Sequence, residues 1–532
     1  MANKEPVFDQ PQAATVTHDE APPGLERWTK DRAFFGHPRG LSTLFFTEMW
    51  ERFSYYGIRP LLVLFMTAAL TSGGFGMDRT VASSIVGIYA ASVYLASLPG
   101  GWIADRWLGL QRAVFWGGVL IALGHICIAL SILFARPAFF VGLVLIVIGT
   151  GLLKPNVSAT VGDLYPEGGA RRDAGFSIFY MGINTGALIA PLITGYLGER
   201  VGWHWGFGAA GLGMIIGVLN YKFRASRTLG PIGAEPRASV DEQRKVRNWS
   251  FAALAVVALV VVLTMVGVIH IDAVALAERM SLIILSLVLL YFIYLFFFAR
   301  LTGAEKKGVA VILVLFVFAT FFWAGFEQAP TSLNLFARDF TDRVVFGWEM
   351  PTAWLQSAEA FFVIVLAPVF AAIWVGLARR GLDLSSPAKF ALGLAFASLS
   401  FYVMLMASHR VVAGSTAGAA LRVSFWWLVG CYFLQSLGEL SLSPVGLSSM
   451  TKLAPRRFVG QMMGIWFTAD ALGNLIAGLV GGHVNPNDLT QMPQLFGRTA
   501  TSLAIAAVVI ALLAIPIRRM MERGGGEARA AY

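Results

Sequence analysis

The sequence is poor in charged residues, cysteine and histidine. Only 14% of its 532 residues are charged, whereas soluble domains carry roughly 25%. The two cysteines, Cys127 and Cys431, lie in apolar stretches and are not spaced as metal ligands. These shortages exclude a soluble globular domain, a disulfide framework and a cysteine redox motif. The sequence also has no His-Glu-x-x-His and no P-loop motif, so neither a zinc enzyme nor an ATPase is expected.

What the chain has instead is a series of apolar runs long enough to cross a bilayer. We predict an all-α integral membrane protein with about fourteen transmembrane helices, near residues 41–70, 81–105, 112–134, 138–162, 174–199, 205–224, 249–269, 276–299, 308–336, 352–379, 388–408, 422–450, 458–482 and 498–519. Lys and Arg gather in every second short loop, as they do in cytoplasmic loops. The net charge of +10 therefore reflects membrane topology and not binding of nucleic acid. We expect a multi-pass protein of the inner or plasma membrane with both termini in the cytoplasm.

One long polar segment, residues 225–248, divides the chain into two unequal parts. The predicted organisation is a polar cytoplasmic tail (1–40), an N-terminal six-helix bundle (41–224), a cytoplasmic linker (225–248), a peripheral two-helix hairpin (249–300), a C-terminal six-helix bundle (301–520) and a second cytoplasmic tail (521–532). Internal repetition supports this division, because residues 151–155 and 186–195 resemble residues 438–442 and 473–482 at one common offset of 287. Two six-helix bundles with a site between them form the major facilitator fold.

Charged residues inside the predicted spans are the main functional signal. Six polar side chains of the first span share a sector of about 140° on a helix: Glu48, Glu51, Arg52, Tyr55, Tyr56 and Arg59. Later spans carry Lys154, Glu327, Glu359, Glu439 and Asp470. An isolated charge in the membrane costs about 2.5–3.5 kcal/mol on the insertion scale, and the acids outnumber the bases. Complete pairing leaves carboxyl groups over, and these are suited to carrying protons. Ion pairs that only lock helices together, and coupling to sodium, remain alternatives.

The first span carries a recognisable motif. E48-M-W-E-R-F-S-Y-Y-G57 resembles the Glu-x-x-Glu-Arg-Phe-x-Tyr-Tyr-Gly signature of the proton-dependent oligopeptide transporter family, also called POT or PTR2. The resemblance continues in G149-T-G-L-L-K-P-N-V-S158, F176-S-I-F-Y-M-G-I-N-T-G186, F326-E-Q328 and G438-E-L-S-L-S-P-V-G-L447. The chain is thereby identified as a bacterial-type member of this family within the major facilitator superfamily.

The resemblance implies a symporter that imports di- and tripeptides with protons by alternating access. It implies a monomer in the lipid bilayer, with protons as the coupling ion and with no other cofactor, metal, nucleic acid or enzymatic activity. By this resemblance, Arg59 and Lys154 hold the peptide carboxylate, and Glu439 and Asn184 hold the amino group. The cavity is lined by four aromatic residues, Tyr55, Tyr56, Tyr94 and Trp466. Glu48, Glu51 and Arg52 couple protons, and Arg59 forms a gating pair with Glu327.

Two positions depart from the pattern of the family. Glu359 stands where the family usually has asparagine, and Asp470 where a small residue is common. Both changes add an acid to the cavity, so we assign both residues to proton coupling and Glu359 also to substrate binding. The sequence leaves three alternatives open for these two acids. They pair with each other or with an arginine, they shift the substrate preference towards basic side chains, or they change the number of protons carried per turnover. Transport of nitrate or an amino acid, and a nutrient sensor that does not transport, are the alternative functions.

Overall fold

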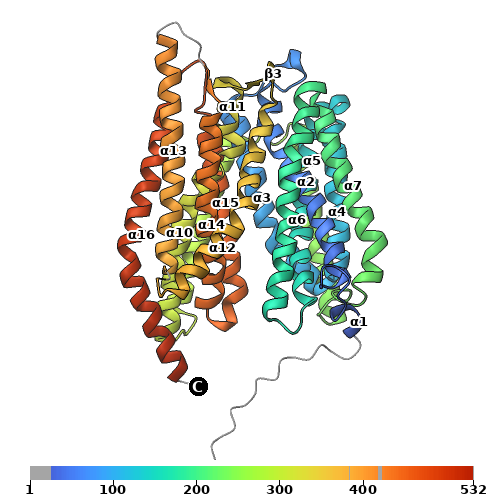
Figure 1. Ribbon diagram of the computed structural model, residues 1–532. Coiled ribbons are helices and arrows are strands. Elements are labelled where there is room, and N and C mark those ends of the chain that lie inside the picture. The colour runs from blue at the N-terminus through green and yellow to red at the C-terminus, as the bar shows by residue number, and fades with distance from the viewer. Residues whose placement is uncertain (1–24, 383, 417–421, 531–532) are drawn as a thin grey trace, which may run out of the picture.

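The computed structural model describes residues 25–382, 384–416 and 422–530, and this part of the chain is almost entirely helical (Figure 1). Most of the predicted N-terminal tail, residues 1–24, lies outside the described residues, as do the last two residues. The C-terminal residues predicted as a tail continue the last helix as far as Ala530. The division of the chain into domains stays a prediction.

The helices and strands follow one another along the chain with short connections. The α-helices are α1 (Glu26–Thr29), α2 (Arg39–Thr67), α3 (Arg79–Ile103), α4 (Leu110–Ala129), α5 (Ser131–Asp163), α6 (Gly169–Tyr196), α7 (Trp203–Thr228), α8 (Val240–Met265), α9 (Ala273–Phe297), α10 (Gly303–Phe326), α11 (Asn334–Phe340), α12 (Ser357–Arg379), α13 (Ser386–Thr416), α14 (Trp426–Leu453), α15 (Val459–Gly481) and α16 (Gln491–Ala530). Short 3-10 turns are η1 (Leu70–Ser72), η5 (Thr352–Gln356) and η6 (Arg456–Phe458), and π-helical turns are η2 (Ala104–Leu108), η3 (Leu197–Val201) and η4 (Ala329–Leu333). The strands are β1 (Thr341–Asp342), β2 (Val344–Val345), β3 (Trp348–Glu349) and β4 (Val423–Ser424), with β1 parallel to β4 and β2 antiparallel to β3.

All the predicted spans but 308–336 coincide with one long helix each, to within a few residues at most ends. Among the described residues, 11 helical segments are long and apolar enough to cross a membrane, and α2, α7 and α14 are not among them. The charged stripe of α2 explains why that helix falls short of the hydropathy of the others. The all-α membrane architecture is therefore confirmed, whereas the number of fourteen membrane-crossing helices stays a prediction.

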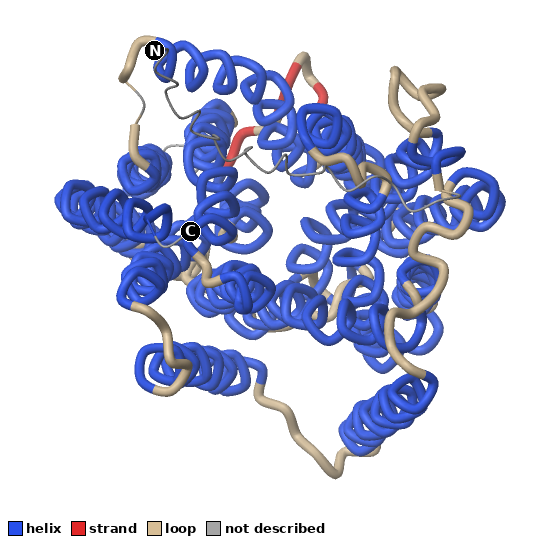
Figure 2. The backbone as a smooth tube through the Cα atoms, turned by 90° about the horizontal axis from the view of Figure 1, so that it is seen from below, coloured by secondary structure: helices blue, strands red, loops and turns tan. Residues whose placement is uncertain are grey.

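The long helices form two groups that stand side by side (Figures 1 and 2). In the N-terminal bundle, α2–α7, helix α2 packs against α6 and α7, and α4 packs against α5. In the C-terminal bundle, α10 and α12–α16, helix α13 packs against α14 and α16, and α10 packs against α15. The two bundles meet where α3 contacts α15 and where α6 contacts α12. The last two contacts bring together segments that are far apart in the sequence.

The helices α8 and α9 lie outside both bundles. Helix α8 begins at Val240, inside the predicted linker, where the hydroxyl of Ser239 accepts a hydrogen bond from the Glu242 amide at 3.4 Å and caps the helix. Most of α8 is exposed, as expected for a helix that faces lipid. Helix α9 differs, because it buries one stripe of side chains and packs against both α3 and α15. It therefore contacts one helix from each bundle.

The predicted span 308–336 lies within one apolar segment, Gly303–Phe340, whose α-helix is interrupted. Helix α10 ends at Phe326, and the π-helical turn η4 connects it to α11. Pro330 lies in this turn, where its missing N–H and its ring are incompatible with an uninterrupted α-helix. The interruption places Glu327 at the end of α10 and directs α11 across the upper end of the molecule as drawn in Figure 1.

At this upper end, which carries α11 and β3, polar contacts join the two bundles (Figure 1). Arg79 of α3 contacts Asp339 of α11 at 2.6 Å and donates to the Val484 carbonyl at 2.8 Å. The Glu199 carboxylate accepts hydrogen bonds from the amides of Thr352 and Ala353, both at 2.8 Å. Towards the lower end, where α1 lies and α16 ends, the ribbons of the two bundles diverge. The contacts thus hold the upper end of the molecule closed.

Replacing Arg79 with Met is expected to favour conformations with an open upper end. The substitution removes a partly buried ion pair between the bundles, and we expect about a fivefold change in the ratio of open to closed conformations. The distance between spin labels at the exposed positions Thr71 and Asn487 measures this change, after both native cysteines are replaced by serine. An unaltered distance distribution would show that Arg79 does not hold this end closed.

Candidate functional site

The charged stripe of α2 is almost entirely buried between the surrounding helices. Glu51 is 0% exposed, and Glu48 and Arg52 are scarcely more accessible. Arg52 Nε lies 3.1 Å from Glu48 Oε1, one helical turn away, and also forms an ion pair with Glu51. One guanidinium therefore forms ion pairs with two carboxylates, which is possible because arginine has several N–H donors. The three residues that the sequence placed on one face do form one cluster.

Farther along the same face of α2, Arg59 crosses to the C-terminal bundle. It forms an ion pair with Glu327 at the end of α10, and both side chains are buried. Beside it, Asn334 Nδ2 donates to the Pro60 carbonyl at 2.7 Å, which fixes η4 and α11 against α2. A carboxylate at a helix C-terminus faces the negative end of the helix dipole, and Arg59 offsets this unfavourable interaction. The sequence-based pairing of Arg59 with Glu327 corresponds to a contact in the structure.

Lys154 of α5 lies beside two groups from other helices. Its Nζ is 3.8 Å from the centroid of the Tyr94 ring of α3, a distance typical of a cation–π contact. Tyr94 in turn interacts with the carboxylate of Asp470 on α15. Asp470 Oδ1 also accepts from Asn474 Nδ2 at 2.9 Å, one turn along the same helix. The structure thereby connects a base of the N-terminal bundle to an acid of the C-terminal bundle through one tyrosine.

A second group contains acids without a basic residue of their own bundle. Glu439 of α14 and Glu359 of α12 are half-buried and act on each other electrostatically. Asn184 of α6 is buried nearby, and its Nδ2 donates to the Tyr180 carbonyl at 3.0 Å. The charges of both glutamates also reach the Tyr180 hydroxyl. The amide of Asn184 and the two carboxylates therefore come together from three helices and two bundles.

Tyr180 is a residue that the sequence reasoning missed. It precedes Asn184 by four residues on α6 and is 42% exposed, although the charges of Glu359 and Glu439 reach it. The spacing of four residues from a predicted site residue was the available signal, because such residues share a helix face. A tyrosine on this face has its hydroxyl available to a ligand between the bundles.

The aromatic residues of the site lie at different depths. Tyr56 and Tyr94 are half-buried, whereas Tyr55 and Trp466 are only 3% exposed. Trp466 packs against the rings of Trp323 and Phe390, with centroids 6.5 and 6.3 Å away. Of the four predicted aromatic residues, Trp466 is the one most enclosed by the apolar side chains of its own bundle.

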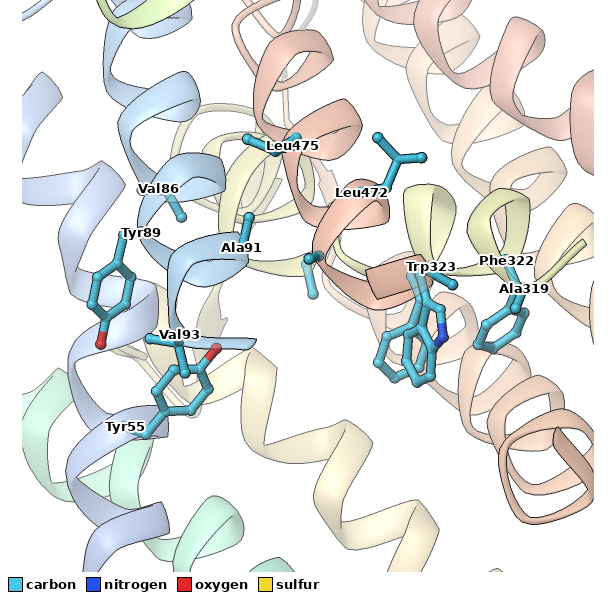
Figure 3. Packing of buried hydrophobic residues seen from close by; sticks show 14 of the residues in the cluster. Tyr55, Val86, Tyr89, Ala91, Val93, Ala319, Phe322, Trp323, Leu472 and Leu475 are labelled. Atoms are coloured by element: carbon cyan, nitrogen blue, oxygen red, sulfur yellow. The ribbon is translucent and has the colours of Figure 1, made fainter. Parts of the chain in front are cut away.

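An apolar layer lies next to the charges and joins the two bundles. Figure 3 shows Tyr55 and Tyr89 on one side and Trp323 on the other, with α15, marked by Leu472 and Leu475, between them. The rings of Tyr55 and Tyr89 are stacked, with centroids 6.3 Å apart. Charge interactions are stronger among buried side chains than in water.

No group of three or more His, Cys, Asp or Glu side chains that could hold a metal ion occurs within the part of the chain that the structure describes. The arrangement consists of fixed charges, amides and aromatic rings on both sides of a contact between two bundles. The bases come from α2 and α5 of the N-terminal bundle, whereas the acids come from α2 (Glu48 and Glu51) and from the end of α10, α12, α14 and α15 of the C-terminal bundle. Such a site is suited to a small ligand that carries both charges.

Comparisons with known proteins give a consistent result. The POT family is matched over residues 111–495. The peptide transporter YePEPT of Yersinia enterocolitica is 50% identical over 502 residues, which are 93% of this chain and 98% of that protein. The di-/tripeptide transporter of Lactococcus lactis subsp. cremoris is 37% identical over 506 residues, 92% of this chain and 98% of its own length. A mutant of the peptide transporter POT solved in complex with alafosfalin superposes with a TM-score of 0.83 at 41% identity, covering 93% and 99% of the two chains.

Proposed function

Because the chain belongs to the POT family and has its major facilitator fold, we propose that it is a proton-coupled symporter that imports di- and tripeptides by alternating access. The observation that carries the proposal is the separation of charge between the bundles, with Arg59 and Lys154 on one side and Glu359 and Glu439 on the other. A peptide is a zwitterion, so its two ends match the two sides. In this proposal Arg59 and Lys154 bind the carboxylate, and Glu439, Glu359 and Asn184 bind the amino group.

The aromatic residues account for broad specificity in this proposal. Tyr55, Tyr56, Tyr94 and Trp466 contact peptide side chains and backbone through rings, which tolerate different shapes better than an array of fixed hydrogen bonds does. The fixed charges recognise only the ends that all short peptides share. The length of the substrate is limited because the two sets of charges are held by rigid helices.

Proton coupling is assigned to carboxyl groups at contacts that change during transport. Glu327 pairs with Arg59 across the two bundles, and Glu48 and Glu51 share Arg52 close to Lys154. A proton on Glu327 weakens its attraction to Arg59 and allows the upper end to open. Asp470 and Glu359 add two further acids to this set. The protein would act as a monomer in the inner or plasma membrane, with both termini in the cytoplasm and with protons as its only coupling ion.

Labelled alanyl-alanine taken up into proteoliposomes tests the proposed function. With an inward proton gradient and a negative interior, we expect concentrative uptake that an uncoupler abolishes. Uptake without a gradient should only equilibrate the peptide, since the bundles alternate but no proton drives accumulation. Failure of the folded protein to concentrate the peptide under a gradient would contradict the proposal. Nitrate and amino acids would then be tested in the same vesicles.

Replacing Glu327 with Gln is expected to reduce proton-driven uptake by about tenfold while exchange of peptide across the membrane continues. Gln resembles a permanently protonated Glu327, so Arg59 loses its charged partner at every pH. The loss of one buried charge interaction of a few kcal/mol is large enough for this effect. The measurement is the ratio of gradient-driven uptake to counterflow at several pH values. A wild-type pH profile in this variant would remove Glu327 from the coupling residues.

A further inference from the structure

Asp470 is an acid of the C-terminal bundle that lies among bases of the N-terminal bundle. It is 5% exposed, its carboxylate accepts a hydrogen bond from Asn474, and it interacts with Tyr94. Helix α15 reaches this position because it packs closely against α3. At Gly87 of α3 and Gly478 of α15 the backbones of the two helices are in contact, and a Cβ added to either glycine would be less than 3 Å from the backbone of the other helix. This close approach places Asp470 beside the N-terminal bundle in this structure.

The charged and titratable groups around Asp470 come from several helices. They are Lys154 of α5, Arg59 and Tyr55 of α2, Tyr94 of α3 and Glu439 of α14. Among these, Lys154 exerts the largest charge interaction on Asp470. Lys154 itself has no ion pair within 4.0 Å among the described residues. Its Nζ lies over the Tyr94 ring at 3.8 Å from the centroid, and both Tyr94 and Lys154 interact with Asp470.

The acids Glu48, Glu51 and Glu359 each have a base other than Lys154 as their main partner. Glu48 and Glu51 are already paired with Arg52. Glu359 is the other acid that departs from the pattern of the family, and the basic residue that acts on it is Arg59. The two additional acids therefore do not neutralise each other. Arg59 acts on both acids, but the base that acts most strongly on Asp470 is Lys154.

We propose that Asp470 is a specificity-determining residue that competes with the substrate carboxylate for Lys154. This inference rests on the proposed function, because it requires that Lys154 binds the carboxylate of the peptide. An ionised Asp470 neutralises part of the positive charge that attracts the ligand, and it repels an arriving anion at short range. Substrate binding is then strongest when Asp470 is neutral. Ligands with a neutral C-terminal end do not encounter this competition.

The test compares two ligands that differ only at that end, alanyl-alanine and alanyl-alanine amide. Their dissociation constants are measured for the purified wild-type protein and for Asp470→Asn, Asp470→Ser and Asp470→Glu at pH 7.5 and at a low pH that protonates the acid. At pH 7.5 both neutral variants should increase the preference for the free carboxylate over the amide by about tenfold. Asp470→Glu keeps the charge and should keep the wild-type preference. At the low pH the difference between wild type and the neutral variants should shrink.

An unchanged preference in both neutral variants would overturn the inference, and so would the same increase in Asp470→Glu. If neither neutral variant folds, Asn474→Ala replaces them. It removes a hydrogen bond that stabilises the ionised carboxylate of Asp470 and so favours the neutral form. The preference for the free carboxylate should therefore rise, and an unchanged ratio would again overturn the inference. If wild type itself binds neither ligand, the proposed function has failed. A wild type that binds alanyl-alanine but shows no dependence on residue 470 contradicts only the present inference.

Discussion

Replacing Arg52 with Met lowers the free energy of unfolding by about 3–5 kcal/mol, the range expected when one partner of a buried ion pair is removed. Arg52 is the guanidinium shared by Glu48 and Glu51, and all three side chains are buried in α2. Without it, two carboxylates remain in a medium that solvates them poorly. The yield of monodisperse protein and its melting temperature in detergent measure the loss.

A variant without any of the three charges provides the control. Combining Arg52→Met with Glu48→Gln and Glu51→Gln removes the uncompensated carboxylates and should recover most of the lost stability, although transport would still be absent. Replacement of a whole buried charge network by neutral groups is often tolerated, whereas removal of one member is not. If the triple variant were no more stable than Arg52→Met, packing around Arg52 rather than its charge would explain the effect.

Replacing Glu439 with Gln reduces the affinity for alanyl-alanine by about 100-fold. Within the described part of the chain, the charges that act on this half-buried carboxylate are those of two acids, Glu359 and Asp470, so an ammonium group of the ligand would be its main attractive partner. The loss of a desolvated charge pair between two molecules amounts to about 2–5 kcal/mol. Equilibrium binding to the purified protein measures the change directly and separates it from any effect on proton coupling.

N-acetyl-alanyl-alanine, which lacks the ammonium group, serves as the matched ligand. Wild type should bind it far more weakly than alanyl-alanine, and Glu439→Gln should bind the two with similar affinity. The substitution of an oxygen by an amide nitrogen leaves the size of the side chain unchanged, so a packing effect would weaken both ligands equally. Wild-type affinity for alanyl-alanine in this variant would remove Glu439 from the amino-group site.

The local part of the site could be predicted from the sequence because helical spacing fixes it. Glu48 and Arg52 are four residues apart, and a helix brings such residues together wherever it lies. The long helices were predictable for the same reason, since runs of about twenty apolar residues leave few alternatives in a membrane. The end of α10 at Phe326 was harder to predict, although Pro330 in the sequence indicated an interruption of the helix there.

Contacts between elements that are distant in the sequence required the structure. Asp470 and Lys154 are both visible as charges inside apolar runs, but neither shows that Tyr94 lies between them. That relation depends on how closely α3 and α15 approach, which the glycines Gly87 and Gly478 permit. The sequence left open whether Glu359 and Asp470 pair with each other. In the structure Arg59 acts on both acids, and Lys154 acts on Asp470 in addition.

The position of α9 connects the bilayer itself to transport. This helix packs against α3 and α15, one from each bundle, while much of its remaining surface is exposed. Any rocking of one bundle against the other changes how α9 tilts and how much of its apolar length the lipid tails must cover. A mismatch between that length and the hydrocarbon thickness costs a fraction of a kcal/mol per Å. The chain length of the surrounding lipids therefore changes the free energy of the conformational change, and the rate of transport depends on the membrane as well as on the protein.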